Sequence, residues 1–351
     1  MDFASDNAVG ASPQVMAALA AANVGPQPAY GADAWTKRAE AMLSDWFERD
    51  VAAFLVATGT GANALALAAV TPPWGAVFCH EHAHIIDDEC GAPEMASGGA
   101  KLVGVAGQAG KLTPPALGET LARFPHGLVK QVQAAAVSLS QATECGTLYT
   151  PDEIAALAAV TRGHRCRLHM DGARFSNALV SLGCTPAEMT WKAGVDVLSL
   201  GMTKNGALAC EAVIFLDPAL AASFPYQRKR GGHTLSKGRL IGAQMVAMLE
   251  NGHWRDNAAH ANAMARRLGE GLRKAGARIP WPIEANEAFV ILSRRADAAL
   301  KAAGARYHDW GARSLPAGEG PKGDEIFARL VASFATTADE VDRFVAVVAA
   351  A

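Results

Sequence analysis

The sequence predicts an α/β protein in which helices cover both faces of a mostly parallel sheet, followed by a smaller domain. One observation is that strand-like segments such as "GAVFCH" (75–80) and "EAVIFL" (211–216) are almost continuously apolar, as strands buried on both faces are. A second is that such segments alternate with helical stretches, for example "PDEIAALAAVTRG" (151–163), the order of a layered α/β fold. A third is a change to long helical patterns from about Ser236.

The other elements of the first part follow the same alternation. In chain order we expect the strand "VAAFLVATG" (51–59), the helix "GANALALAAV" (61–70), and the strands "AKLVGVAG" (100–107), "AAAVSLS" (134–140), "CRLHMDGA" (166–173) and "VDVLSLG" (195–201).

The last third of the chain predicts a second unit. Two long helical patterns end at glycines, as helices commonly do, and two strand patterns and a final helix follow. Thr337 and Glu340 form a capping-box pattern for that helix. The segments are helices 237–252 and 257–277, strands 287–295 and 324–334, and helix 338–350. We therefore expect a large domain with an N-terminal arm in residues 1–240, and a small C-terminal α+β domain with a linking helix in 241–351.

Charge and cysteine content narrow the function class. The 351 residues carry 32 Lys+Arg against 34 Asp+Glu, and the one short basic run is "QRKR" (227–230), so we expect small-molecule partners rather than nucleic acid or a membrane. The 6 cysteines form no C-x-x-C pair, which predicts no disulfide framework and no metal site. Without a leader pattern or an apolar run of roughly 18 residues, we expect a cytoplasmic protein.

The segment "ATGTGANA" (57–64) follows a strand and opens a helix. Its backbone N–H groups and the hydroxyls of Thr58 and Thr60 would face an anion at the positive end of that helix, which suits a phosphate. The same letters match the G-x-G-x-x-A dinucleotide fingerprint, with Glu81 about 20 residues on. An NAD site, or a tight turn without a ligand, therefore remains open at this point.

Two further strand ends carry chemistry. Asp171 in "HMDGAR" ends one strand, with Gly172 permitting a close approach, and Lys204 in "TKNG" follows another. A protonated pyridine needs a carboxylate against its nitrogen, and a lysine beside a buried strand end can form a Schiff base with an aldehyde. Each residue alone would more often brace a loop or face solvent. The order phosphate turn, Asp, Lys favours pyridoxal 5'-phosphate (PLP).

These motifs together resemble a known family. The set "FASDNAVG", "AYGADAWT", "TGTGANAL", "HMDGARFSNA", "LGCTPAEMTWKAGVDVL" and "TKNG" is similar to the L-threonine aldolases of the β-eliminating lyase group. The likeness extends over essentially the whole chain. It implies the aspartate-aminotransferase fold, which is fold type I of the PLP-dependent enzymes.

The resemblance also implies residue roles around the cofactor. Lys204 would bind PLP as a Schiff base, Asp171 would pair with the pyridine nitrogen, and Gly59 and Thr60 would take the phosphate. His84 matches a histidine that stacks on the ring near the substrate hydroxyl, where it or a water it holds would accept the hydroxyl proton. On the sequence alone, His84 could equally be a buried core residue.

For the substrate, the resemblance points to Arg174 and Arg329 as carboxylate ligands, with Ser5 as a further hydrogen-bond donor, because a guanidinium meets a carboxylate with two hydrogen bonds. Arg329 could instead be a surface charge on an edge strand. Glu144 stands where many relatives have a second histidine.

The resemblance further implies a homodimer or homotetramer with active sites at the subunit interface. Tyr30 in "AYGAD", and Lys237 or Arg230 in "RKRGGHTLSKGR", would then serve the site of the neighbouring subunit, Tyr30 towards the substrate and Lys237 towards the phosphate.

The predicted function is PLP-dependent retro-aldol cleavage of L-3-hydroxy-α-amino acids, such as threonine, allo-threonine and phenylserine, to glycine and an aldehyde. One alternative is another PLP reaction on the same fold, β-elimination or transamination. An NAD-dependent oxidoreductase and a non-catalytic binding protein are the others.

Overall fold

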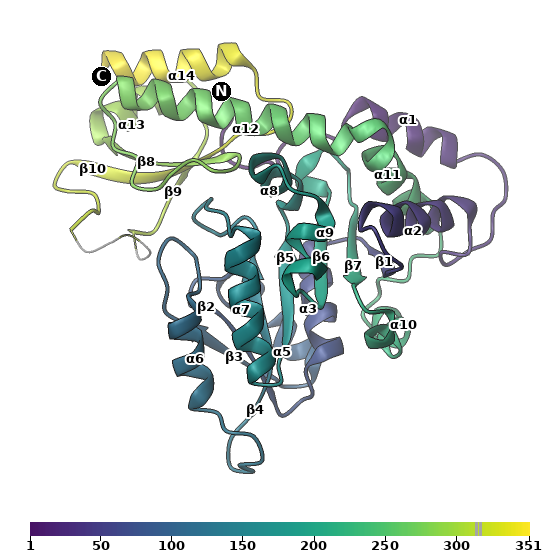
Figure 1. Ribbon diagram of the computed structural model, residues 1–351. Coiled ribbons are helices and arrows are strands. Elements are labelled where there is room, and N and C mark those ends of the chain that lie inside the picture. Colours follow the sequence, from purple (N-terminus) through teal and green to yellow (C-terminus); the bar gives the residue numbers. More distant parts are fainter. Residues whose placement is uncertain (313–314, 316–317) are drawn as a thin grey trace.

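The protein is layered around one large sheet, with a smaller sheet and its helices packed above it (Figure 1). The computed structural model describes residues 1–312, 315 and 318–351. Within that part of the chain, the large sheet has seven strands in the order β1-β7-β6-β5-β4-β2-β3. The small sheet has the order β8-β10-β9. The predicted α/β class is confirmed.

The strands are β1 (Ala52–Val56), β2 (Gly75–His80), β3 (Lys101–Val105), β4 (Gln133–Ser140), β5 (Arg167–Gly172), β6 (Val197–Gly201), β7 (Glu211–Phe215), β8 (Glu287–Ser293), β9 (His308–Asp309) and β10 (Glu325–Val331). The α-helices are α1 (Pro13–Ala22), α2 (Ala34–Trp46), α3 (Gly59–Val70), α4 (His84–Asp87), α5 (Ala92–Ser97), α6 (Pro114–Ala122), α7 (Pro151–Gly163), α8 (Phe175–Leu182), α9 (Pro186–Met189), α10 (Phe224–Arg230), α11 (Arg239–Leu249), α12 (His253–Lys274), α13 (Arg294–Ala302) and α14 (Ala338–Ala350). Short 3-10 turns are η1 (Trp191–Ala193), η2 (Thr203–Asn205), η3 (Pro218–Ala221) and η4 (Glu250–Gly252).

Strand directions decide where the functional residues meet. The pairs β3/β2, β2/β4, β4/β5 and β5/β6 are parallel, whereas β7 runs antiparallel to both β6 and β1. Strand β1 therefore points the same way as β6, and the carboxyl ends of all strands except β7 share one edge. Ligands of open α/β sheets bind at such an edge. Strand β7 begins there, at Glu211.

Helices cover both faces of the large sheet. One face packs against α2, α6, α7, α8 and α11 in the main hydrophobic core, and the other packs against α3, α4 and α10. Burial on two sides explains why β2, β6 and β7 are buried at every position and why the segments 75–80, 197–201 and 211–215 show no polar alternation.

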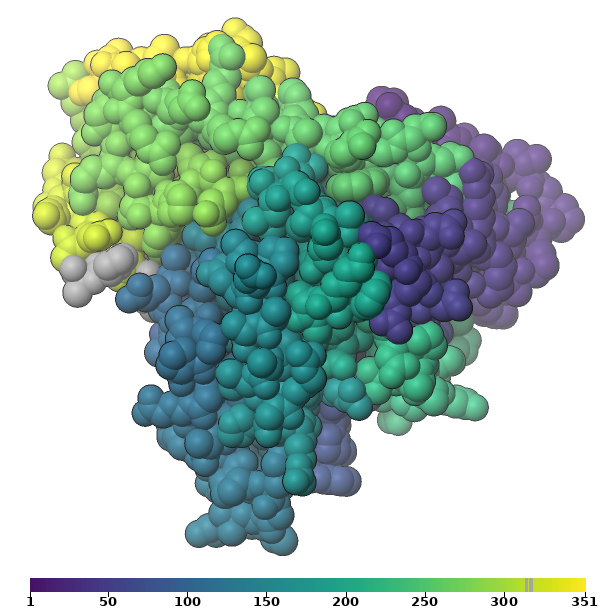
Figure 2. Space-filling model, in the orientation of Figure 1, coloured from purple at the N-terminus to yellow at the C-terminus, as the bar shows by residue number. Residues whose placement is uncertain are grey.

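The small sheet has its own core with α12, α13 and α14, and Phe3 from the N-terminal arm lies fully buried in that core. The arm is held by hydrogen bonds from the Phe3 N–H to the Arg306 carbonyl and from the Val331 N–H to the Phe3 carbonyl. In the space-filling view, the N-terminal segment lies against α11 and α12 (Figure 2). Apolar side chains of residues 241–248, which were expected in the small domain, pack into the main core of the large sheet. The predicted domain boundary at residue 240 stays a prediction.

Local sequence signals account for several element ends. The Thr337 hydroxyl accepts from the Glu340 N–H and the Glu340 carboxylate accepts from the Thr337 N–H, which confirms the predicted capping box of α14. The strand predicted for 287–295 ends at Ser293, because this serine caps α13 through its hydroxyl. Helix α12 begins at His253, four residues before the predicted start at 257.

Candidate active site

A cavity of about 370 Å³ opens at the carboxyl edge of the large sheet. A second cavity of about 570 Å³ adjoins it, and both are lined by His84, Glu144, Arg174 and Lys204. The first also contains Gly59, Thr60 and Asp171, and the second contains Ser5 and Arg329. Eight of the ten site residues expected from the sequence are therefore brought together, from elements distant along the chain.

The turn between β1 and α3 presents an anion-binding helix end. The Thr58 hydroxyl accepts from the Gly61 N–H at 3.0 Å, while the N–H groups of the first helical residues, Gly59 and Thr60, have no acceptor within the helix. A Cβ atom at Gly59 would meet nothing within 4 Å, so the turn faces open space. A Cβ atom at Gly61 would lie 2.2 Å from His233 Nε2, so a side chain does not fit at that position. This geometry fits a phosphate group.

The strand order excludes the dinucleotide interpretation of the same turn. That fingerprint belongs to a βαβ unit whose two strands are neighbours. Here β1 and β2 are separated by β7, β6, β5 and β4, and the exposed Glu81 does not line the cavity that contains Gly59.

Asp171 is buried at the end of β5 and is held by two donors. Its Oδ2 accepts from Asn63 Nδ2 at 2.8 Å, and its Oδ1 accepts from the Ala173 N–H at 3.0 Å. The Asn63 amide also donates to Glu89 Oε1 at 2.8 Å. A Cβ at the neighbouring Gly172 would lie 2.9 Å from the Ser199 carbonyl oxygen, which confirms the predicted close approach. A carboxylate has about four acceptor positions, so Asp171 can accept a further N–H from the cavity.

His84 begins α4 and interacts with two carboxylates. Its Nδ1 lies 2.8 Å from Glu89 Oε1, and its backbone N–H donates to Glu144 Oε1 at 2.9 Å. The hydrogen bond to Glu89 raises the pKa of His84 above its ordinary value, against the opposing effect of burial. His84 is therefore not a satisfied core histidine, because its side chain is 43% exposed and lines both cavities.

Lys204 lies in η2, directly after β6. Among the described residues its ammonium group has no hydrogen-bond or ion-pair partner at contact distance, and it lines both cavities. Glu211, opposite Gly201 in the sheet register, lines the first cavity as well. Burial raises the pKa of Glu211 to about 7. The unpaired lysine is available for a covalent bond to a ligand.

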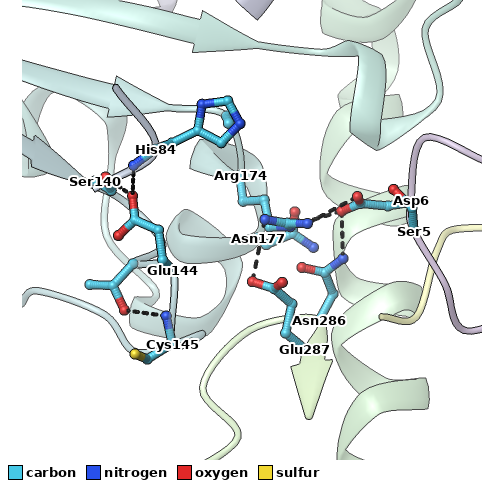
Figure 3. Close-up of polar contacts among 12 residues, drawn as sticks. Ser5, Asp6, His84, Ser140, Glu144, Cys145, Arg174, Asn177, Asn286 and Glu287 are labelled. Atoms are coloured by element: carbon cyan, nitrogen blue, oxygen red, sulfur yellow. Dashed lines mark hydrogen bonds and ion pairs between the residues drawn. The ribbon is translucent and has the colours of Figure 1, made fainter. Parts of the chain in front are cut away.

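Arg174 is engaged by two buried carboxylates (Figure 3). Its Nε and Nη2 donate to Asp6 Oδ2 and Oδ1 at 2.8 and 3.0 Å, and its Nη1 lies 3.3 Å from Glu287 Oε2. Asn286 Nδ2 also donates to Asp6 at 3.0 Å. Arg174 thus joins the N-terminal arm, β8 and the loop before α8. These contacts use three of its five N–H donors, and Arg174 lines both cavities, so its predicted substrate role stays a prediction.

Arg329 is in the opposite situation. It lies in β10, the central strand of the small sheet, so the alternative of an edge-strand surface charge is wrong. Its guanidinium stacks on the Trp310 ring at 4.3 Å, and within the described part of the chain its buried Nε has no hydrogen-bond partner. Burial lowers the pKa of Arg329, and the nearby Arg174 contributes to that direction. An unpaired guanidinium that lines a cavity is a ready carboxylate ligand.

Glu144 belongs to the loop after β4. Its Oε1 accepts from Ser140 Oγ at 2.6 Å as well as from the His84 N–H (Figure 3), whereas its Oε2 is buried and has no partner among residues 1–312, 315 and 318–351. Burial raises the pKa of this carboxyl to about 6.

Tyr30 and Lys237 lie elsewhere. The Tyr30 N–H donates to the Ser236 carbonyl at 3.0 Å, Tyr30 is 57% exposed, and neither residue lines the two cavities. Their predicted roles at the site of a neighbouring subunit stay predictions.

Several residues of the site were not found from the sequence: Asp6, Asn63, Glu89, Glu211, Asn286 and Glu287. For Asn63 a signal existed, because it lies in the first turns of the helix opened by the phosphate turn. Asp6 lies beside Ser5 in the quoted segment "FASDNAVG", whereas the other four carry no functional motif.

Comparisons with known proteins agree with this geometry. The family model described as beta-eliminating lyase matches residues 2–295. This chain belongs to that family. A curated relative, the low specificity L-threonine aldolase of Pseudomonas aeruginosa, is 45% identical over 87% of this chain and 88% of its own length. The threonine aldolase structure of Leishmania major has a TM-score of 0.91 and 30% identity, covering 99% of this chain and 98% of that one.

A serine palmitoyltransferase of Sphingomonas wittichii has a TM-score of 0.74 at 18% identity, covering 100% of this chain and 86% of that one, and shares the fold. The family membership confirms the predicted resemblance to L-threonine aldolases, the lyase class, fold type I and PLP as the cofactor. In the described part of the chain, no helix is long and apolar enough to cross a bilayer. No cluster of three or more His, Cys, Asp or Glu there could hold a metal ion.

Proposed function

We propose that this protein cleaves L-3-hydroxy-α-amino acids, of the threonine, allo-threonine and phenylserine type, into glycine and an aldehyde. The observation that supports the proposal best is the meeting of Lys204, Asp171 and the α3 N-terminus in one cavity, in a chain 45% identical to an enzyme named low specificity L-threonine aldolase.

The residues of the cavity fit PLP. Lys204 would hold the cofactor covalently, Asp171 would accept the pyridine N–H, and Gly59 and Thr60 would bind the phosphate through their backbone N–H groups. When bound, PLP supplies an electron sink for the electron pair left at Cα when the Cα–Cβ bond breaks. The partnerless Lys204 ammonium, the remaining acceptor capacity of Asp171 and the open space at Gly59 support this placement.

The protein orients the substrate through its carboxylate. Arg329 would bind it, with the Ser5 hydroxyl beside it and Arg174 near by in the second cavity. Holding the carboxylate fixes which bond at Cα stands in position to break. His84 Nε2, left over by the bond from Nδ1 to Glu89, would contact the substrate hydroxyl, whose proton must leave as the aldehyde forms.

The experiment that tests the function is incubation of the PLP-loaded enzyme with threonine, allo-threonine and phenylserine. We expect equimolar glycine and acetaldehyde from the first two, and glycine and benzaldehyde from the third, measured by chromatography. Ammonia and a keto acid in place of glycine would assign the protein to elimination or transamination chemistry instead.

Replacing Arg329 with alanine is expected to raise KM for threonine by about 10- to 100-fold, since a hydrogen bond to a charged group contributes roughly 1.5–3 kcal/mol. The turnover number should change less, because the carboxylate is bound in the ground state as well as in the transition state. Arg329→Lys should recover part of the affinity. The control is Arg306→Ala, which removes an exposed arginine of the same domain paired with Asp2. Equal KM values in the Arg329→Ala and Arg306→Ala variants would contradict the assignment.

A homodimer or homotetramer in the cytoplasm completes the proposal, with Tyr30 and Lys237 serving the neighbouring site. The exposed apolar side chains of Val24, Tyr30 and Leu208 favour a covered surface, and Leu208 also lines the first cavity. Buried thiols without disulfides, such as Cys79 and Cys210, suit a reducing compartment. Light scattering measures the assembly, and a monomeric mass would refute it.

A further inference from the structure

Glu144 is a buried acid that the substrate-binding and cofactor-binding roles above do not use. Its Oε1 is occupied by the Ser140 hydroxyl and the His84 N–H, while its Oε2 is buried and finds no partner in the described part of the chain. A buried carboxyl oxygen left without a donor is costly and calls for an explanation. Because Glu144 lines both cavities together with Lys204, a turn of its carboxyl group would present Oε2 to a donor of a ligand in those cavities.

We propose that Glu144 is the proton-transfer residue of the reaction, which accepts the proton of the substrate β-hydroxyl through Oε2 as the Cα–Cβ bond breaks. This inference rests on the proposed aldolase function. The step balances within the site: the O–H bond is broken, its proton passes to the carboxylate, and its electron pair forms the carbonyl of the departing aldehyde. The Cα–Cβ electron pair stays on the glycine fragment.

The division of labour between Glu144 and His84 follows from their contacts. His84 Nδ1 is bonded to Glu89 Oε1 at 2.8 Å, and this carboxylate favours the protonated ring, which raises the pKa of His84. In its protonated form His84 would donate a hydrogen bond to the substrate oxygen. Burial raises the pKa of Glu144 to about 6, so Glu144 is ionised and able to accept a proton above that pH. Two groups in one site whose environments separate their protonation states act as acid and base.

Several charged or titratable groups lie near Glu144 and affect its pKa. His84, Asp171, Arg174 and Lys204 line cavities that Glu144 also lines, and Asp171 adds to the rise of the Glu144 pKa after burial. Behind the loop, burial raises the pKa values of Cys79 and Tyr149, with a further contribution from the Glu144 charge. Those two groups stay neutral throughout the working pH range. Glu211 lines the first cavity as well, and burial raises its pKa to about 7, so the acidic limb is assigned to Glu144 by its disappearance in the Glu144→Gln variant.

The test uses Glu144→Gln in the PLP-loaded enzyme. The amide retains an oxygen that can accept from Ser140 and His84, and it replaces only the partnerless Oε2 by an NH₂ group, so the loop should keep its shape. We expect threonine cleavage to fall by roughly 10²- to 10⁴-fold, as for the loss of a general base, and the acidic limb of kcat to disappear. Exchange of the glycine α-proton with D₂O, followed by NMR, should persist, because glycine has no hydroxyl group.

Two variants separate this role from a structural one. Ser140→Ala removes a hydrogen bond that favours the ionised carboxyl, so it should move the acidic limb to higher pH without removing it. His84→Gln should lower the rate and keep the limb. The inference is overturned if Glu144→Gln cleaves threonine at the wild-type rate or retains the limb, or if it loses glycine exchange together with cleavage. A wild-type enzyme that exchanges glycine without cleaving threonine would refute the proposed function itself.

Discussion

Replacing Lys204 with alanine should remove both the covalently bound cofactor and threonine cleavage. Lys204 follows β6, has no hydrogen-bond or ion-pair partner among the described residues, and lines the cavity that also contains Asp171. We expect activity to fall by roughly 10³-fold or more, because under the proposed function the lysine would both attach the cofactor and move protons at Cα, and acid–base catalysis alone contributes roughly 10²–10⁴-fold. The measurements are the visible spectrum of the loaded protein and the rate of glycine release.

The covalent attachment can be located directly. Borohydride reduction of the wild-type enzyme should fix the cofactor on the peptide that contains Lys204, as read by mass spectrometry, and no peptide of the Lys204→Ala variant should be modified at equal yield. The control is Lys192→Ala, which removes a lysine on the surface paired with Glu48 and should keep the spectrum and the rate. Modification of another lysine, or an active Lys204→Ala variant, would contradict the assignment.

The layers of the fold were predictable because their cause is local. The segments 75–80, 197–201 and 211–215 are apolar at both faces since helices cover both faces, and the Thr337 capping box specifies where α14 begins. The strand order was not predictable in the same way. The position of β1 beside β7 rather than beside β2 depends on contacts across the whole domain, and it is this order that removes the dinucleotide interpretation of the turn at Gly59.

The site also has a part that the sequence could predict and a part that it could not. Gly59, Asp171 and Lys204 follow strands, and the carboxyl ends of parallel strands must meet at one edge, so their meeting could be predicted from position alone. The partners that hold the site depend on tertiary structure. Asp6 and Arg174 are 168 residues apart in the chain, and the motif around Arg174 gives no indication that its Nε and Nη2 donate to the N-terminal arm.

An Asp6→Ala variant tests what that long-range contact contributes. Asp6 is 1% exposed and Arg174 is 11% exposed, so removing Asp6 leaves a buried guanidinium with only Glu287 at 3.3 Å. Breaking a buried ion pair in this way costs roughly 3–5 kcal/mol, and we expect a loss of that size in the free energy of unfolding, measured by urea denaturation. Asn286 would also lose the carboxylate that accepts its amide.

The matched control is Asp342→Ala, which breaks an ion pair of the same geometry on the exposed surface. Arg267 and Asp342 form a two-point pair at 2.7 Å, but their side chains are 51% and 56% exposed, so Asp342→Ala should leave stability almost unchanged.

The pH dependence of stability adds a second check on the Asp6–Arg174 pair. Burial alone would raise the pKa of Asp6, but Arg174 and Lys204 outweigh it and hold the pKa below the ordinary value of 3.8. The stabilisation is therefore complete above pH 3.8 and is lost as the pH falls towards the folded pKa. If Asp6→Ala and Asp342→Ala lower stability equally near neutral pH, burial is not the source of the effect.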